Sequence, residues 1–165
     1  MNMEKIQLAI VLFTLSIGGL YAQEDTNQKA PKHVLYGSIG SAYVVTTGTI
    51  GYDFKLYEPD SGFFKSYYAT SQVGYSYIDG IIGDDIHAIG ISLGATGLTG
   101  KGKNHFELGL GGIYYFDVGE SNGEIENSIY PRITLGYRYQ DTKGFVFRSG
   151  VSTTEWLYVG FGFSF

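Results

Sequence analysis

Cysteine is absent from this sequence, and its absence excludes a disulfide framework, a thiolate metal site and a cysteine nucleophile. Lipid attachment through an N-terminal cysteine is excluded for the same reason. The sequence also lacks a large cluster of lysine and arginine, and its formal net charge is −5. Nucleic acid is therefore not an expected partner, because binding to phosphates needs a basic surface.

Helical patterning is also missing, since no segment after the first 22 residues repeats apolar side chains at helical spacing. The chain is rich instead in glycine and aromatics, with 25 glycines, 15 tyrosines and 11 phenylalanines, while charged residues make up only 16%. Glycine combined with aromatics at alternating positions is typical of β-barrels. The length of 165 residues fits one domain.

Residues 1–22 are predicted to form a secretory signal peptide. Their apolar core, 8–17, is too short to span a bilayer, and Leu20-Tyr21-Ala22 precedes an expected cleavage site before Gln23. A short buried helix or an inner-membrane anchor is the alternative. Residues 23–32 are polar and are predicted to be a disordered periplasmic leader.

From residue 33 onward, apolar side chains repeat with a period of two, which predicts β-strands. Most of these strands have about ten residues, the length at which a tilted strand crosses a bilayer. An even number suits a single-chain bacterial barrel. The predicted fold of 33–165 is all-β: a closed antiparallel eight-stranded transmembrane β-barrel. The eight predicted strands are 34–45, 48–57, 67–77, 86–97, 104–116, 129–140, 144–152 and 156–165.

Alternate residues in these strands separate large apolar side chains from glycine and charge. In the sixth strand, Ile133 and Leu135 share one face, whereas Arg132, Gly136 and Arg138 share the other. A soluble barrel would turn its apolar face inward and its charges to water. Glycine on the polar face instead suits a narrow lumen where side chains of eight strands converge. The apolar face is therefore predicted to meet lipid.

Six charged residues on the polar face are predicted to pair and to plug the lumen, because buried charges must be paired. Side chains about fill the interior of an eight-stranded barrel, so a water-filled pore is not expected. Bidentate geometry favours Asp53 and Glu107 as the hubs. The six are Asp53, Lys55, Glu107, Arg132, Arg138 and Arg148.

The last eight residues carry an aromatic at every second position from Phe161 to the end. Closure of the barrel requires this segment to pair with the first strand, near Leu35 to Tyr43, which removes the sheet edge. The positions of Gly160, Phe163 and Phe165 also match the signal that the outer-membrane assembly machinery reads. An ordinary final strand is the alternative.

Three segments resemble the small eight-stranded outer-membrane barrels common in Bacteroidota. They are 106–111 (FELGLG), 136–140 (GYRYQ) and 144–151 (GFVFRSGV), followed by the aromatic final strand. The resemblance implies this fold and an outer-membrane location, and it adds almost nothing about activity. Family members often have a longer final outward loop than Thr153 to Glu155, which weakens the transfer of a surface-binding role.

Catalysis on lipid A would need a serine nucleophile, a histidine base and an acidic residue that orients it. The histidines are His33, His87 and His105, and none lies in a motif tied to that chemistry. The sequence therefore predicts no enzyme, no catalytic or cofactor-binding residues and no metal site. Asp84 and Asp85, next to His87, fit a solvated turn better than a metal site. The loop 120–126 lacks the ligand spacing of a calcium loop.

These observations predict a structural or interaction role in the outer membrane. The expected partners are outer-membrane lipid, lipopolysaccharide and the assembly machinery, the expected oligomeric state is a monomer, and no cofactor is expected. Two alternatives remain: a lipid A-modifying outer-membrane enzyme, and a soluble periplasmic barrel that binds a small apolar ligand.

Overall fold

The computed structural model describes residues 30–42, 45–78, 86–117 and 129–165, and these fold into eight β-strands. The predicted signal peptide, most of the leader, and the pair Asp84–Asp85 lie outside the described residues. In the part that is described, no helix is long and apolar enough to cross a membrane. The strands are β1 His33–Ala42, β2 Val45–Tyr57, β3 Phe64–Ile78, β4 Ile86–Thr99, β5 Asn104–Asp117, β6 Ile129–Gln140, β7 Gly144–Ser152 and β8 Trp156–Ser164.

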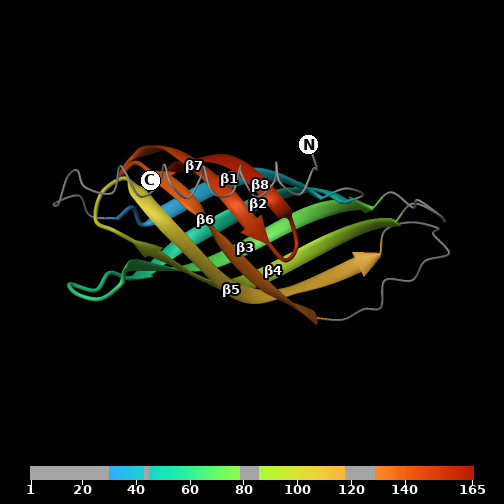
Figure 1. The fold of residues 1–165 in the computed structure, drawn as a ribbon, viewed down its shortest axis with the longest axis horizontal. Helices are drawn as coiled ribbons and strands as arrows, with labels where there is room; N and C mark the ends of the chain where they lie inside the picture. Colours follow the sequence, from blue (N-terminus) through green and yellow to red (C-terminus); the bar gives the residue numbers. More distant parts are fainter. Residues whose placement is uncertain (1–29, 43–44, 79–85, 118–128) are drawn as a thin grey trace, which may run out of the picture.

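The strands form a closed barrel in which each strand pairs antiparallel with the next and β8 pairs with β1. Figure 1 shows them wound obliquely around a common axis. The closing ladder runs from Val34 opposite Ser164 to Ser41 opposite Leu157. Two backbone bonds of 2.9 Å join His33 and Phe165 beyond it. The predicted fold class is therefore confirmed, and the sheet has no free edge.

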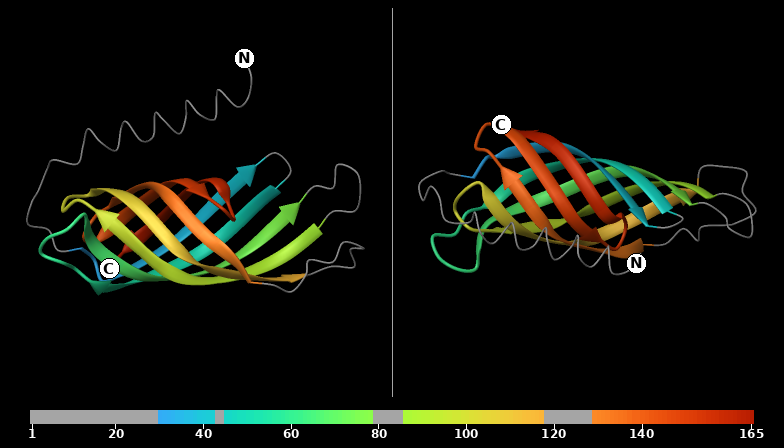
Figure 2. Two further views of the ribbon diagram at one scale, coloured as in Figure 1. Left: turned by 60° about the horizontal axis from the view of Figure 1, so that its bottom comes forward. Right: turned by 45° about the horizontal axis from the view of Figure 1, so that its top comes forward.

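The barrel has two distinct ends. At one end lie His33, Phe165, the β2–β3 connector 58–63 and the turn 100–103, and we call this the terminal end (Figure 2). The opposite end, here called the loop end, carries the β7–β8 turn 153–155.

The two faces of the wall differ sharply in chemistry. Most leucine, isoleucine, valine and aromatic side chains point outward, and many of them are exposed, as at Ile39, Leu93 and Phe163. The regularly paired parts of the described strands have no Asp, Glu, Lys or Arg on the outward face. The buried charged side chains all lie on the inward face, as at Glu107 and Arg138. Alternation along a paired strand produces both faces at once.

Three local features differ from the sequence-based expectation. β1 ends at Ala42 and β2 begins at Val45, so the predicted first strand was too long and residues 46–47 belong to β2. The third strand begins at Phe64, which shortens the second connector. Tyr57, expected on the face of Asp53, is 63% exposed because a register shift between Lys55 and Tyr57 interrupts the alternation.

Candidate functional site

The most elaborate polar site among the described residues lies inside the barrel, around Glu107 of β5. Arg138 Nε donates to Glu107 Oε2 over 2.5 Å, and Arg138 Nη2 donates to Asp53 Oδ2 over 2.6 Å. Arg148 Nη2 pairs with Glu107 Oε1, and its Nε lies 3.2 Å from Oε2. The structure thus joins four of the six predicted residues, and all four side chains are nearly inaccessible to solvent.

Strand pairing explains why these four side chains meet. Arg138 of β6 stands directly opposite Arg148 of β7 on the inward face. Like charges at such positions repel each other. Glu107 is bonded to both guanidiniums, and Asp53 reaches Arg138 from the far wall, on β2. The cluster therefore ties three neighbouring strands to the opposite side of the barrel.

Tyrosines complete the packing around the arginines. The Arg148 guanidinium carbon lies 3.9 Å from the centroid of the Tyr36 ring, in a cation–π arrangement. The Tyr36 hydroxyl donates to Asp53 and accepts from Gln72. The ring covers Gly51, its cross-strand partner, where any side chain would collide with it. Aromatic stacking and hydrogen bonding thus fix the same charges.

The chain before β1 closes the terminal end of this network. Tyr68 donates to the carbonyl of Pro31 over 3.0 Å and accepts from Gln140, which in turn accepts from Arg138. Pro31 is buried. A continuous hydrogen-bonded path therefore runs from the chain segment at the mouth to the ion pairs at the centre.

Lys55, predicted to join the network, lies at the terminal rim instead. Its Nζ pairs with Glu58 Oε2 at 2.7 Å and donates to the carbonyl of Ala30 at 2.5 Å. The side chain is long enough to leave the lumen and to keep its ammonium group near water. Lys55 is the next residue after Asp53 on the same face of β2, and it lies where this strand reaches the rim.

Arg132 forms a separate buried pair with Glu155, a residue that the sequence analysis placed in a loop. Arg132 Nη2 and Glu155 Oε2 are 3.8 Å apart, and both side chains are almost fully buried. Glu155 Oε1 also accepts from Ser38 Oγ at 2.6 Å and Thr49 Oγ1 at 2.9 Å. Among the described residues, the lumen therefore balances three buried carboxylates against three buried guanidiniums.

The turn that carries Glu155 has an unusual backbone. Trp156 follows it with φ of 56°, a conformation that large side chains rarely adopt. Glu155 is buried in the lumen, whereas Trp156 is 56% exposed. Pairing at this end is less complete, because Nε and Nη2 of Arg132 and the hydroxyl of Tyr158 have no hydrogen-bond partner in the described part of the chain.

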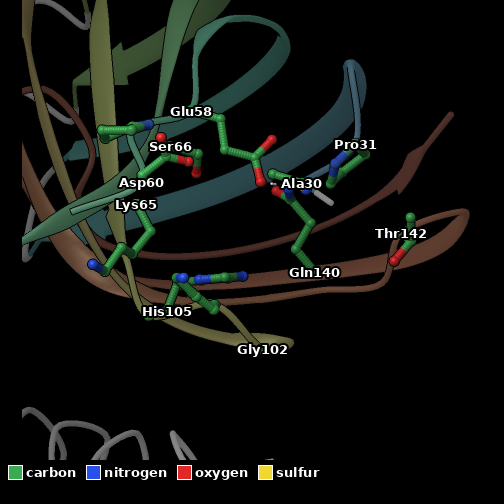
Figure 3. Close-up of a pocket in the computed structure, with 13 residues that line it drawn as sticks. Ala30, Pro31, Glu58, Asp60, Lys65, Ser66, Gly102, His105, Gln140 and Thr142 are labelled. Carbon is green, nitrogen blue, oxygen red and sulfur yellow. Dashed lines mark hydrogen bonds between the residues drawn. The ribbon is translucent and has the colours of Figure 1, made fainter. Parts of the chain in front are cut away.

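A pocket of about 350 Å³ opens at the terminal end (Figure 3). Lys65, Lys101 and His105 supply its basic groups, and Glu58 and Asp60 supply its acidic groups. Figure 3 shows the Glu58 carboxylate turned toward Ala30, whose N–H it accepts at 3.3 Å. Charges of both signs line the pocket, so it selects no single class of ligand by charge.

The three histidines lie in different settings. His105 is buried at the rim of the lumen, and its Nδ1 lies 2.6 Å from the carbonyl of Thr99. His87 faces outward, with Nδ1 2.6 Å from the Tyr75 hydroxyl. His33 lies in β1, with Nδ1 2.7 Å from the Tyr52 hydroxyl. Within the described residues, no group of three His, Asp or Glu could hold a metal ion.

The residues assigned to the assembly signal all lie in or beside β8. Gly160 is buried on the inward face, and Phe163 and Phe165 are exposed on the outward face. The Phe165 ring stacks on His33 with centroids 5.3 Å apart.

Sequence reasoning missed Glu155, Tyr36 and Tyr68. Alternation along the strand could have placed the two tyrosines in the lumen. Tyr36 and Tyr68 lie on the same face as Val34 and Thr70, which are buried. Glu155 has no such signal, since it precedes β8 and its direction depends on the turn.

The fold defines a class: a closed, eight-stranded antiparallel β-barrel with a polar, charged interior. No family model and no curated protein matches the chain. Solved structures similar to the chain include the following two. One, from the de novo design of transmembrane β-barrels, has a TM-score of 0.49 and 14% identity, and the match covers 84% of this chain and 97% of that one. The other, the outer membrane enzyme PagL, has a TM-score of 0.47 and 12% identity, with 79% and 95% covered.

The second likeness corrects one expectation. The sequence analysis predicted that the protein is not an enzyme, and the match to an outer membrane enzyme contradicts that prediction. At 12% identity the likeness concerns the fold, and it assigns no activity to this chain.

Proposed function

We propose that the protein is an integral β-barrel of the outer membrane of a Gram-negative bacterium, with a lumen closed by side chains and a structural or interaction role. The observation that carries the proposal is the division of the wall: apolar and aromatic side chains cover the outward face, and the buried charges lie inside. Exposure of this apolar surface to water would be unfavourable in free energy, whereas lipid would cover it.

Closure of the sheet supports the same proposal. A bilayer offers no hydrogen-bond partners to backbone groups, so a spanning sheet must have no edge. The β1–β8 ladder meets this requirement. Tyr77, Tyr114, Tyr137 and Tyr139 are on the outward face toward the strand ends, where interfacial aromatic girdles lie.

The finer points of the proposal come from the sequence. They are cleavage of a signal peptide over 1–22, a periplasmic location for the terminal end, membership of the small Bacteroidota barrels, and contact with outer-membrane lipid and lipopolysaccharide.

Fractionation and a gel-shift measurement test the proposal. The full chain, expressed in a Gram-negative host, is expected in the outer-membrane fraction. Folded in detergent, it is expected to change mobility on a denaturing gel between unheated and boiled samples, because a closed barrel resists the detergent until heated. Recovery in the soluble periplasm, together with no heat-dependent shift, would refute the membrane assignment in favour of a soluble barrel that binds an apolar ligand.

The closed lumen gives a prediction about conductance. Arg138, Arg148 and Tyr36 are among the largest side chains that are fully buried, and they lie inside the barrel. We expect no unitary conductance steps from the purified protein in a planar bilayer, since these buried and ion-paired side chains would block the passage of ions. A general porin added to the same bilayer afterwards controls for insertion conditions. Reproducible steps from this protein alone would show that the lumen conducts.

The assembly signal gives a second prediction. Phe165→Ala is expected to reduce the outer-membrane level in cells several-fold, while it lowers the unfolding free energy of the refolded barrel by less than about 1 kcal/mol. The ring is 60% exposed, and the two backbone bonds to His33 do not depend on it. Immunoblots of membrane fractions measure the first effect, and urea titration measures the second.

Phe145→Ala is the matched control, because Phe145 is also outward, is 48% exposed and stands opposite Phe163. A general requirement for aromatics on this wall would lower both variants equally. Normal outer-membrane levels of Phe165→Ala would show that the assembly role is wrong.

A further inference from the structure

The outer wall contains an apolar hollow of about 670 Å³, which we call the furrow. It crosses five adjacent strands, from β8 through β1, β2 and β3 to β4. The outward residues that line it are Gly37, Ile39, Gly48, Ile50, Val73, Tyr75, Ile89, Val159 and Phe161.

Two glycines create the furrow. Gly48 faces outward, and a side chain added there would meet nothing within 4 Å. At Gly37 the nearest atom to such a side chain is the carbonyl oxygen of Thr49, at 3.7 Å. Ile39 stands opposite Gly48 and Ile50 stands opposite Gly37, and both isoleucines are more than 60% exposed. The glycines therefore form a floor beside raised apolar walls.

We propose that the furrow binds one acyl chain of a bilayer lipid. This inference rests on the proposed membrane location, because the furrow then faces the hydrocarbon layer. The outward lining is almost entirely hydrocarbon, so shape and dispersion contacts would hold the occupant. An acyl chain offers CH₂ groups along its whole length and needs no hydrogen-bond partner.

A peptide segment fits the furrow poorly. The barrel is closed, so each strand is paired on both sides and no free edge can accept another strand. A bound peptide in an extended conformation would have to leave its own backbone N–H and C=O groups unpaired in an apolar environment, which costs several kcal/mol per group.

A second copy of the chain also fits poorly. A twofold interface brings the same patch of both subunits together. Two hollows placed face to face would leave a void between them, and unfilled space in an apolar contact forfeits dispersion energy. The concave shape therefore favours a flexible hydrocarbon chain over self-association.

The furrow has one polar border, which sets the direction of the lipid. Tyr75 lines the furrow on β3, and its hydroxyl lies 2.6 Å from Nδ1 of His87 on β4. Both residues lie near the loop end of their strands. The headgroup would lie beside this pair and the acyl chain would run toward Phe161, so the lipid comes from the leaflet at the loop end.

Native mass spectrometry tests the inference. The full chain is inserted into vesicles of phosphatidylethanolamine and phosphatidylglycerol, extracted into mild detergent and measured for retained lipid. Gly48→Leu places an apolar side chain in the furrow, and its Cβ would meet nothing within 4 Å. Ala95→Leu is the control, because Ala95 is also outward and exposed, and it does not line the furrow. We expect one retained lipid on wild type and Ala95→Leu, and loss of that lipid from Gly48→Leu.

Each other outcome overturns the inference. Equal lipid retention by wild type and Gly48→Leu, or no retained lipid on wild type, would show that the furrow does not hold a chain. Heat-dependent mobility of the same vesicle samples is measured in parallel. A wild type that inserts but retains no lipid refutes only the furrow, whereas a wild type that does not insert refutes the membrane location and the furrow together.

Discussion

Replacing Glu107 with alanine is expected to lower the free energy of unfolding by about 3–5 kcal/mol, the range for breaking a buried ion pair from one side. The substitution leaves Arg138 and Arg148 directly opposite each other, with Asp53 as the remaining buried acid of the cluster. Both guanidiniums are almost fully buried, so solvent cannot take over the role of the carboxylate. The cost therefore includes lost bonds and two arginine charges left under-compensated.

Urea titration of the barrel folded in vesicles measures this effect. Glu58→Ala is the control, since Glu58 also pairs with a cation but its side chain is 35% exposed at the rim. A pair of that kind contributes about 0–1 kcal/mol. Similar losses for Glu107→Ala and Glu58→Ala would show that the central cluster is no more important than a surface pair.

A double variant separates pairing from simple loss of packing. If Glu107 and Arg148 stabilise each other, removal of both is expected to cost less than the sum of the two single removals. Additive losses would mean that each side chain acts through its own packing. Arg148→Ala alone also removes the stack on Tyr36, so the cycle needs the same alanine in both backgrounds.

The barrel itself could be predicted from the sequence because alternation is a local property. In β8, Phe161 and Phe163 are exposed and Gly162 is buried, as the pattern requires. The same rule failed at Tyr57, the last residue of β2, because a register shift between Lys55 and Tyr57 interrupts the alternation. Strand ends near residues 42–45 were misplaced, since β-branched and aromatic residues continue through the predicted boundary.

The interior site could be predicted only in outline. The inward charges of β2, β5, β6 and β7 follow from parity, but their pairing depends on strand tilt and register around the barrel. Alternation predicted that the Lys55 side chain lies in the lumen. Lys55 is close enough to the rim, however, for its ammonium group to pair with Glu58 there. Glu155 enters the lumen from a turn, and no period of two applies there. Contacts across a closed sheet thus require the three-dimensional register.

Adding one methyl group at Gly150 tests how closely β6 and β7 approach. A Cβ there would lie 2.5 Å from Cα of Gly136 and 3.0 Å from the carbonyl carbon of Leu135. These are backbone atoms of the neighbouring strand, so a rotamer change cannot relieve the contact. Gly150→Ala is therefore expected to lower the unfolding free energy by about 2–3 kcal/mol, toward the upper end of the range for overpacking.

Gly48→Ala is the matched control for that substitution, because it adds the same methyl group to β2 where nothing lies within 4 Å. It is expected to stabilise the barrel by about 0.5 kcal/mol, since glycine is disfavoured within a strand. The opposite signs follow from space alone, because neither glycine has a φ that excludes alanine. Arg148 lies two residues before Gly150, so separation of β6 from β7 would also loosen the central ion pairs. A neutral Gly150→Ala in urea titration would show that the two strands can move apart freely, and that the glycine pair does not hold the arginines in register.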